Sequence, residues 1–139
     1  MAASFKLHIR SADADFYEGD CVSLSLRLSD GEMGLMANHS PMAAAVVPGT
    51  LFFRLPDGTA VNAVGGNGLV RFENNDALLL LDSVERVEDI DVPRARAALA
   101  NAREALKTSR TQQERLQAES DLARAQSRLR AAGIYEATE

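Results

Sequence analysis

Three arginines in the C-terminal part of the chain are the residues best suited to bind a ligand. Arg94 lies on one predicted helix, and Arg124 and Arg128 lie four residues apart on a second helix, so these two share a helical face. If the two helices fold together, the three guanidinium groups can converge. Arginine binds phosphate oxygens through two parallel hydrogen bonds, so this set suggests a phosphate ligand. The alternative is a solvated basic face that binds nothing.

Other patterns that can indicate catalysis have simpler explanations here. Gly65-Gly66-Asn67-Gly68 is followed by a strand pattern rather than by Lys-Ser/Thr and a helix, so we predict a tight turn and no phosphate loop. His8 falls on the polar face of a predicted strand and His39 falls in a loop, and neither has a nucleophile or metal-ligand motif around it. Asp89 and Asp91 stand at a helix start, where the helix dipole explains them. We therefore expect no catalytic residues, no metal site and no required cofactor.

The composition fits a small globular protein without covalent cross-links. The chain has 139 residues, of which 46% are hydrophobic, and a net charge of −5, which argues against nonspecific binding to nucleic acid. Cys21 is the only cysteine, so no internal disulfide can form. Apolar runs such as Ala77–Leu81 are far too short to cross a bilayer, and the N-terminus has no signal-peptide pattern. These features predict a protein at a cytosolic face, without membrane insertion.

Charge and hydrophobic periodicity both change near residue 89. Residues 1–89 hold 13 Asp/Glu and 6 Lys/Arg, whereas residues 90–139 hold 7 Asp/Glu and 9 Lys/Arg. The apolar period changes there from two to between three and four residues. We therefore predict a β-sandwich domain over residues 1–88 and a helical hairpin over residues 89–139.

The first part has the pattern of a β-sandwich. Phe5, Leu7 and Ile9 alternate with polar residues, as in a strand with one buried face, and the alternation recurs at residues 22–28. Turns containing Gly, Asn, Asp or Pro separate four further short segments. These segments are Thr50–Leu55, Thr59–Val64, Leu69–Glu73 and Ala77–Leu81. Many short strands with close-set turns predict an antiparallel β-sandwich or barrel.

The second part predicts two antiparallel helices. Residues 94–132 contain no Gly or Pro and are rich in good helix formers. Asp91 is the expected N-cap, Thr108–Thr111 the expected bend, and Gly133 the expected stop. Apolar residues recur every three or four positions on both helices. They are Ala95, Leu99, Ala102 and Leu106, then Ala118, Leu122, Ala125, Leu129 and Ala132. Two such helices with a short connection form an antiparallel hairpin.

The alanine content of this stripe predicts weak packing. Full burial of a large apolar side chain contributes roughly 1.5–3 kcal/mol, and alanine contributes far less. The hairpin should therefore be marginally stable and able to detach or repack. The alternative is a structural hairpin that keeps one position.

Two motifs carry a resemblance to a known family. Asp30–Leu35 is followed by His39-Ser40-Pro41, and the predicted hairpin begins with Asp89–Ala95. In this order and spacing they resemble the Gly-Glu-(Leu/Met)-Gly loop, the later His-x-Pro and the Ile/Leu-Asp-x-x-Arg-Ala hairpin entry of the epsilon subunits of F-type ATP synthases, called delta in mitochondria. Ala37-Asn38 replaces the usual Pro-Gly, but Asn38 can adopt the left-handed conformation of such a turn. The resemblance spans essentially the whole chain.

The resemblance implies a non-catalytic rotor subunit. Such proteins dock their sandwich on the gamma subunit and on the polar loops of the membrane c-ring, and thereby couple ring rotation to ATP synthesis. By this resemblance Glu32 and His39, expected in loops at one end of the sandwich, would face the c-ring. The hairpin of bacterial members either lies folded on the sandwich or extends along gamma toward the alpha and beta subunits, where it inhibits ATP hydrolysis. The chain would then lie peripherally on the cytoplasmic face of an energy-transducing membrane, the plasma membrane in bacteria.

Some bacterial members also bind ATP in the folded hairpin as a regulatory ligand. The positions that match their motif here are Glu85, Ile90, Asp91, Arg94, Ala95, Arg124 and Arg128. Asn101 stands where strong ATP binders have a basic residue, which removes one phosphate contact. ATP bound to the folded hairpin would relieve inhibition, because a ligand favours the state that it binds.

Two other classes of function stay open at this point. One is a free-standing nucleotide-sensing protein, whose main property is affinity for ATP rather than assembly. The other is a small enzyme, which needs a buried pair of groups with shifted pKa values. Copurification with gamma separates the rotor subunit from the nucleotide sensor.

Overall fold

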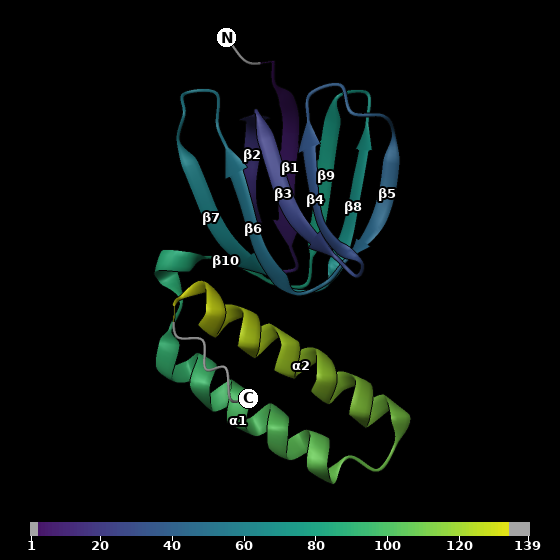
Figure 1. Cartoon of the computed structure of the whole chain (residues 1–139), viewed down its shortest axis with the longest axis vertical. Helices are drawn as coiled ribbons and strands as arrows, with labels where there is room; N and C mark the ends of the chain where they lie inside the picture. Colours follow the sequence, from purple (N-terminus) through teal and green to yellow (C-terminus); the bar gives the residue numbers. More distant parts are fainter. Residues whose placement is uncertain (1–2, 134–139) are drawn as a thin grey trace. The chain divides into compact units, whose positions relative to one another are not determined.

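The computed structural model describes residues 3–133 and divides the chain into two units between Arg86 and Val87. The first unit consists of strands and the second of helices (Figure 1). The predicted fold, a β-sandwich followed by a helical hairpin, is therefore confirmed.

Ten short strands form in the described part of the first unit. They are β1 (Phe5–Ser11), β2 (Asp15–Cys21), β3 (Ser23–Leu28), β4 (Gly31–Met36), β5 (Met42–Val46), β6 (Gly49–Arg54), β7 (Ala60–Gly65), β8 (Gly68–Glu73), β9 (Asp76–Leu81) and β10 (Val84–Arg86). The sequence pattern predicted β1, β3, β6, β7, β8 and β9, each within one or two residues of its ends. It did not predict β2, β4, β5 or β10.

The strands form one sheet that folds over into two layers. Its order is β10-β7-β6-β3-β5-β8-β9-β1-β2, with β4 paired to β3. Only Leu28 and Val46 join β3 to β5, so the sheet can bend sharply at this junction. The neighbours pair antiparallel, as predicted, except β1 and β9, which run parallel from Lys6 opposite Asp76 to Ser11 opposite Leu81.

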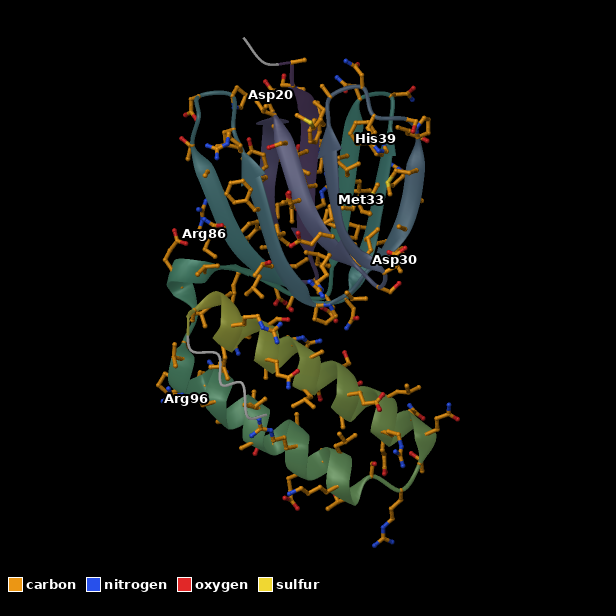
Figure 2. All side chains as sticks on the ribbon, in the orientation of Figure 1. Asp20, Asp30, Met33, His39, Arg86 and Arg96 are labelled. Atoms are coloured by element: carbon orange, nitrogen blue, oxygen red, sulfur yellow. The ribbon has the colours of Figure 1, made fainter. Side chains whose placement is uncertain are left out.

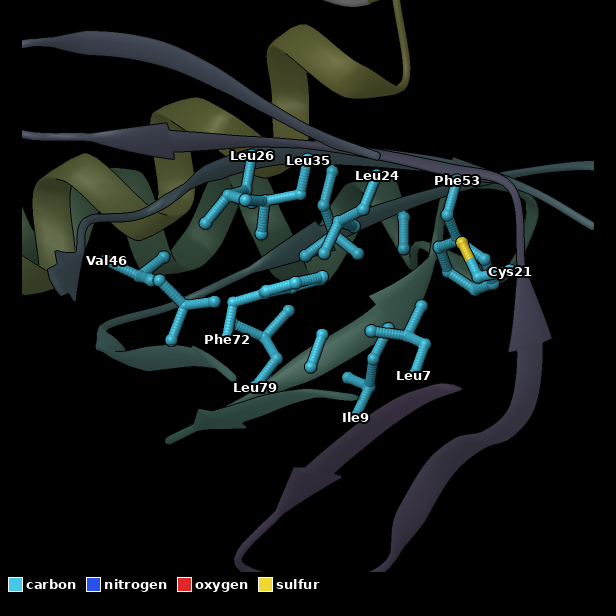
Figure 3. Close-up of a cluster of buried hydrophobic side chains, with 14 of the residues drawn as sticks. Leu7, Ile9, Cys21, Leu24, Leu26, Leu35, Val46, Phe53, Phe72 and Leu79 are labelled. Atoms are coloured by element: carbon cyan, nitrogen blue, oxygen red, sulfur yellow. The ribbon is translucent and has the colours of Figure 1, made fainter. Parts of the chain in front are cut away.

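Alternating side chains from both layers fill the core of the sandwich (Figure 3). Phe5, Leu7 and Ile9 of β1 are at most 2% exposed, as their spacing predicts. Phe5 meets Phe72 of β8 edge to face, with ring centroids 5.4 Å apart. Cys21 is also fully buried, and burial raises the pKa of its thiol to about 11.

Two turns have the backbone conformations that their residues favour. Asn38 has a φ of 67°, so it takes the left-handed conformation predicted for it. Gly68 stands where the chain passes from β7 to β8, and a Cβ atom there would lie 1.8 Å from the carbonyl oxygen of Leu80. The Gly65–Gly68 segment is thus a tight turn, and one of its glycines is required by close backbone approach.

The second unit is a short 3-10 turn, η1 (Val87–Asp89), followed by α1 (Val92–Thr108) and α2 (Gln112–Ala131). The Asp91 carboxylate caps α1 by accepting a hydrogen bond from the Arg94 amide, at 3.2 Å. Thr111 caps α2 by accepting from the Glu114 amide, at 3.0 Å. Both the predicted N-cap and the predicted bend are confirmed.

The core of the hairpin is thin. Its central cluster consists of Ala95, Leu99, Ala125 and Leu129, with the half-buried Val92, Ala98 and Leu122 packed against it. Ala102, Ala118 and Ser127 are the other buried residues of the two helices. Leu99 and Leu129 are the two large side chains that are buried here, at 6% and 5% exposed. The helices run antiparallel (Figure 1) and meet mainly through alanine, as the sequence predicted.

Candidate functional site

A groove between the two helices contains the arginine pair singled out by the sequence. It has a volume of about 400 Å³ and is lined by Ala98, Asn101, Ala102 and Ala105 of α1 and by Asp121, Arg124, Ala125 and Arg128 of α2. The alanines leave this space open because their side chains do not fill the gap between the helices. The groove is therefore lined by alanines together with four polar or charged side chains, Asn101, Asp121, Arg124 and Arg128.

The charges that line the groove partly offset one another. Arg124 and Arg128 lie one helical turn apart and are both half-buried. The Asp121 carboxylate lies 3.9 Å from the Arg124 guanidinium and also accepts a hydrogen bond from the Gln117 side chain, at 2.9 Å. A bound anion would compete with Asp121 for Arg124, so the groove suits an anion but not a tightly held one.

The other residues of the predicted nucleotide motif have different surroundings. Asp91 caps α1, and Ala95 is fully buried against α2, so these two positions are explained by hairpin packing. Arg94 is exposed in the first turn of α1, on the same face as Ala98 but outside the lining of the groove. Ile90 is half-buried just before the helix. Nucleotide binding at these positions stays a prediction.

Glu85 belongs to the other unit. It lies on β10, half-buried and opposite Val64 of β7. The structure therefore brings Arg124 and Arg128 together with Asn101 within the second unit, whereas Glu85 belongs to the first.

The predicted placement of Glu32 and His39 in loops at one end of the sandwich is wrong. Glu32 lies on β4, opposite Arg27 of β3, because the glycines of Gly31–Met36 are compatible with a strand. His39 lies in the loop beyond the other end of β4, where its ring meets Phe72 at a centroid distance of 5.7 Å. Asp30 and His39 mark opposite ends of the sandwich (Figure 2), and β4 between them spans about 17 Å. Contact of either residue with a c-ring stays a prediction.

An apolar surface that the sequence patterns did not predict lies on the outside of β5, β8 and β9. Leu69 of β8 is 60% exposed and Leu80 of β9 is 44% exposed, and the two lie directly opposite each other in the sheet register. Three neighbours on the same side complete a patch that we call the exposed apolar face. Its residues are Ala43, Ala45, Leu69, Leu78 and Leu80. Exposed apolar side chains gathered on one sheet face suit contact with another molecule.

One signal for this surface was present in the sequence. Residues Ala77–Leu81 are all apolar, whereas a strand with one solvated face alternates with polar residues. Leu79 and Leu81 fill the core, and Leu78 and Leu80 point outward. An uninterrupted apolar run on such a strand indicates that something covers its outer face.

Charged residues of β1 and β2 border the exposed apolar face. The His8 ring lies 3.4 Å from Glu18 and 3.3 Å from Asp76, and Arg10 lies 3.4 Å from Glu18. Hydrogen bonds from His8 and Arg10 hold the pKa of Glu18 below its ordinary value. These charges are thus already paired within the sandwich.

Residues 3–133 contain neither a candidate metal cluster nor a helix that could cross a membrane. No group of three or more His, Cys, Asp or Glu residues there is arranged to hold a metal ion. None of the helices in that range has the length and apolar character needed to span a membrane.

Comparison with known proteins matches both units to one family. Residues 4–87 match the family model for the beta-sandwich domain of the ATP synthase delta/epsilon chain, and residues 88–133 match the model for its long alpha-helix domain. The chain is 35% identical over 129 residues to the ATP synthase epsilon chain of Ruminiclostridium cellulolyticum, covering 93% of this chain and 96% of that one. It is 39% identical over 103 residues to the ATP synthase epsilon chain of Gloeobacter violaceus, covering 74% and 77%.

Solved structures share the fold. A chain in the cryo-EM structure of the Euglena gracilis mitochondrial ATP synthase superposes with a TM-score of 0.77 at 23% identity, over 95% of this chain and 82% of that one. A chain in the central stalk and c-ring structure of the Tetrahymena thermophila mitochondrial ATP synthase superposes with a TM-score of 0.66 at 11% identity, over 94% and 98%.

Proposed function

Since this chain belongs to the delta/epsilon family of ATP synthase subunits, we propose that it acts as a central-stalk epsilon subunit that has no active site of its own. Its sandwich docks on the gamma subunit and on the c-ring, so that ring rotation is coupled to ATP synthesis. Its hairpin regulates ATP hydrolysis by the alpha and beta subunits. The protein is then held peripherally at the cytoplasmic face of an energy-transducing membrane.

The observation that carries the docking proposal is the exposed apolar face of β5, β8 and β9. The exposed fractions of Leu69 and Leu80 together amount to about one fully exposed leucine. Burying that surface against gamma contributes roughly 1.5–3 kcal/mol, before the neighbouring alanines and Leu78 are counted. Docking through a broad sheet face also lets the sandwich turn with gamma as one body.

For the c-ring we propose the end of the sandwich that carries Asp30 and Glu32. Both residues are exposed beside the β3–β4 turn and make this end acidic. An acidic surface suits polar ring loops that carry basic residues, and such charges set register and association rate more than affinity. His39 lies at the opposite end of the sandwich, so Glu32 and His39 cannot both contact the c-ring.

For regulation we propose a hairpin that exchanges between a folded and an extended state. Its thin core, with two large buried side chains, makes the folded state easy to open. The extended helices reach the alpha and beta subunits and inhibit hydrolysis. ATP bound in the groove between α1 and α2 favours the folded state and so relieves inhibition.

ATP binding in the groove depends on Arg124 and Arg128, which grip phosphate oxygens from adjacent turns of α2. Replacing either by alanine should weaken ATP binding about tenfold, since a hydrogen bond to a charged group contributes about 1.5–3 kcal/mol and both arginines are half-exposed. Calorimetric titration of the full chain with ATP measures this, with Arg96→Ala as a matched control on the exposed side of α1. Equal affinities for all of these variants would refute the assignment.

Binding to gamma tests the docking proposal. Leu69→Asn should weaken binding of the full chain to a gamma-containing complex about 30-fold or more, because it removes apolar burial and brings a polar amide into the contact. Met36→Asn is the matched control, since Met36 is 62% exposed on β4, outside the exposed apolar face. If the wild-type chain binds ATP but not gamma, the second candidate, a free-standing nucleotide sensor, takes the place of the rotor subunit.

A further inference from the structure

Arg71 stands in the middle of the exposed apolar face. It lies on β8, directly opposite Ala43 of β5 on one side and Leu78 of β9 on the other. Leu69 lies two residues before it on the same face of the strand, and Arg71 itself is exposed. Three of the outer-face neighbours of this cation are thus apolar, and the fourth is Glu73, two residues further along β8.

The charges of β1 that border this face have partners, whereas Arg71 and Glu73, which are two residues apart on the outer side of β8, have none among residues 3–133. Lys6 pairs with Asp20 at 2.7 Å, Arg10 pairs with Asp15 and Glu18, and His8 lies between Glu18 and Asp76. Arg71 shares a shallow depression with His8, Arg10 and Asp76, yet it makes no hydrogen bond or ion pair with any residue between 3 and 133.

A partner that covers this face binds more tightly if it supplies a group for Arg71. Water pairs with the guanidinium while the face is exposed, and docking removes that water. An arginine that is buried without a partner opposes binding, whereas a carboxylate opposite it forms two parallel charge-assisted hydrogen bonds. The planar fork of arginine makes such a pair selective for an acidic group in one orientation.

We propose that the surface docked on the exposed apolar face presents a carboxylate side chain to Arg71, set among apolar residues. The proposal rests on the proposed function, in which that surface belongs to gamma. Arg71 then determines which partner fits: the apolar residues supply contact area, and the ion pair at their centre fixes register and excludes surfaces without an acid at that point.

The direction in which Arg71→Met changes affinity for the gamma-containing complex distinguishes this proposal from docking by apolar contact alone. Arg71→Met keeps the length of the side chain and removes its charge. If a carboxylate lies opposite, Arg71→Met leaves that carboxylate buried and unpaired, and affinity for the gamma-containing complex should fall at least tenfold. Arg71→Glu should weaken binding at least 100-fold, because two carboxylates then face each other. If no carboxylate is present, Arg71→Met adds apolar contact and binds as tightly as the wild-type chain or more tightly, which overturns the proposal.

Arg54→Met is the matched control. Arg54 is exposed on β6, outside the exposed apolar face, where it donates to the Gly58 carbonyl oxygen and lies over the Phe52 ring. This variant should bind gamma with unchanged affinity. Near-identical thermal unfolding of the Arg54→Met and Arg71→Met chains shows that any loss of affinity is not a loss of fold.

A zero-length cross-link identifies the acid directly. In an Arg71→Lys chain bound to the complex, a water-soluble carbodiimide should activate the partner carboxylate, and the new amine should displace the resulting urea to form an amide bond. Mass spectrometry should then find a peptide of gamma joined to position 71, and the wild-type chain should give no such product. If the Arg71→Lys chain binds the complex normally but forms no cross-link, the proposal is contradicted.

Failure of the docking proposal gives a different result. If Leu69→Asn weakens binding but Arg71→Met does not, the exposed apolar face docks on gamma, and only the proposed carboxylate opposite Arg71 is refuted. If the wild-type chain does not bind gamma, or if neither variant changes binding, both proposals fail.

Discussion

Replacing Leu129 by alanine should open the helical hairpin and leave the sandwich folded. Leu129 is 5% exposed and packs with Ala95, Leu99 and Ala125 in the core of the hairpin. A Leu→Ala change in a core costs about 2–5 kcal/mol, and a thin core that can collapse lies at the low end of that range. The two buried leucines contribute roughly 1.5–3 kcal/mol each, so losing one removes about half of their contribution.

Hydrogen exchange on the full chain measures this effect in each unit separately. A loss of about 2 kcal/mol corresponds to roughly 30-fold faster exchange of the amides protected in α1 and α2. The amides of β8 and β9 belong to the other unit and should keep their protection. Leu116→Ala is the matched control, because Leu116 lies on the same helix but is 57% exposed, and it should change exchange only slightly.

Two results would refute this reasoning. Equal effects of Leu129→Ala and Leu116→Ala would mean that burial in the hairpin core does not set its stability. Equal loss of protection in β8 and α2 would mean that the two units open together, which would remove the physical basis for a hairpin that changes state alone.

Three further predictions test the sandwich and the helix start. Burial raises the pKa of Cys21 from 9.0 to about 11, so the unfolded chain releases this proton first, and the thiol should lower stability by roughly 2–3 kcal/mol as pH rises from about 9 to 11; urea unfolding across that range checks this, and Cys21→Ala should show a clearly smaller fall, which comes from groups such as Tyr17 and Lys6 whose pKa values are also raised. Gly68→Ala should destabilise the sandwich by more than about 3 kcal/mol, because its Cβ meets the Leu80 carbonyl oxygen, whereas Gly34→Ala, with open space around it, should stay within about 0.5 kcal/mol in thermal unfolding. Asp91→Ala should cost the hairpin about 1 kcal/mol by removing the cap of α1, which faster exchange in its first turn would reveal; unchanged exchange there would contradict the role of the cap.

The strands that the sequence predicted are those in which a local pattern reflects burial. In β1 and β8 alternate residues face the core, so period-two alternation was visible. The strand β2 was missed because it is an edge strand, rich in acidic residues and half-exposed along most of its length. In β4 two glycines suggested a loop, and in β5 three alanines gave no alternation between large apolar and polar residues. Neighbouring strands supply the pairing there, which no local pattern shows.

The pairing of strands that are distant in the sequence could not be predicted from the sequence pattern either. The parallel alignment of β1 with β9 joins residues 70 positions apart, and nothing in either segment specifies its direction. The same pairing places His8 beside Asp76 and so builds the charged border of the exposed apolar face.

The candidate sites were likewise predictable where spacing along one helix places the residues, and not where residues from separate elements come together. The spacing of Arg124 and Arg128 was sufficient to place them on one helical face, and the groove with Asn101 followed from antiparallel packing. Glu85 entered through a family motif and lies in the other unit, where no spacing argument applies. Arg71 drew no notice in the sequence, since its meaning depends on Ala43 and Leu78 on adjacent strands.

The most direct test of the account is ATP hydrolysis by an epsilon-depleted catalytic head that contains gamma, titrated with the full chain and with a version ending at Glu88. We expect saturable inhibition by the full chain and none by the shorter version, with both binding to gamma. Binding of both versions without inhibition would contradict the regulatory role of the hairpin. The absence of both inhibition and gamma binding with the full chain would contradict the rotor subunit itself.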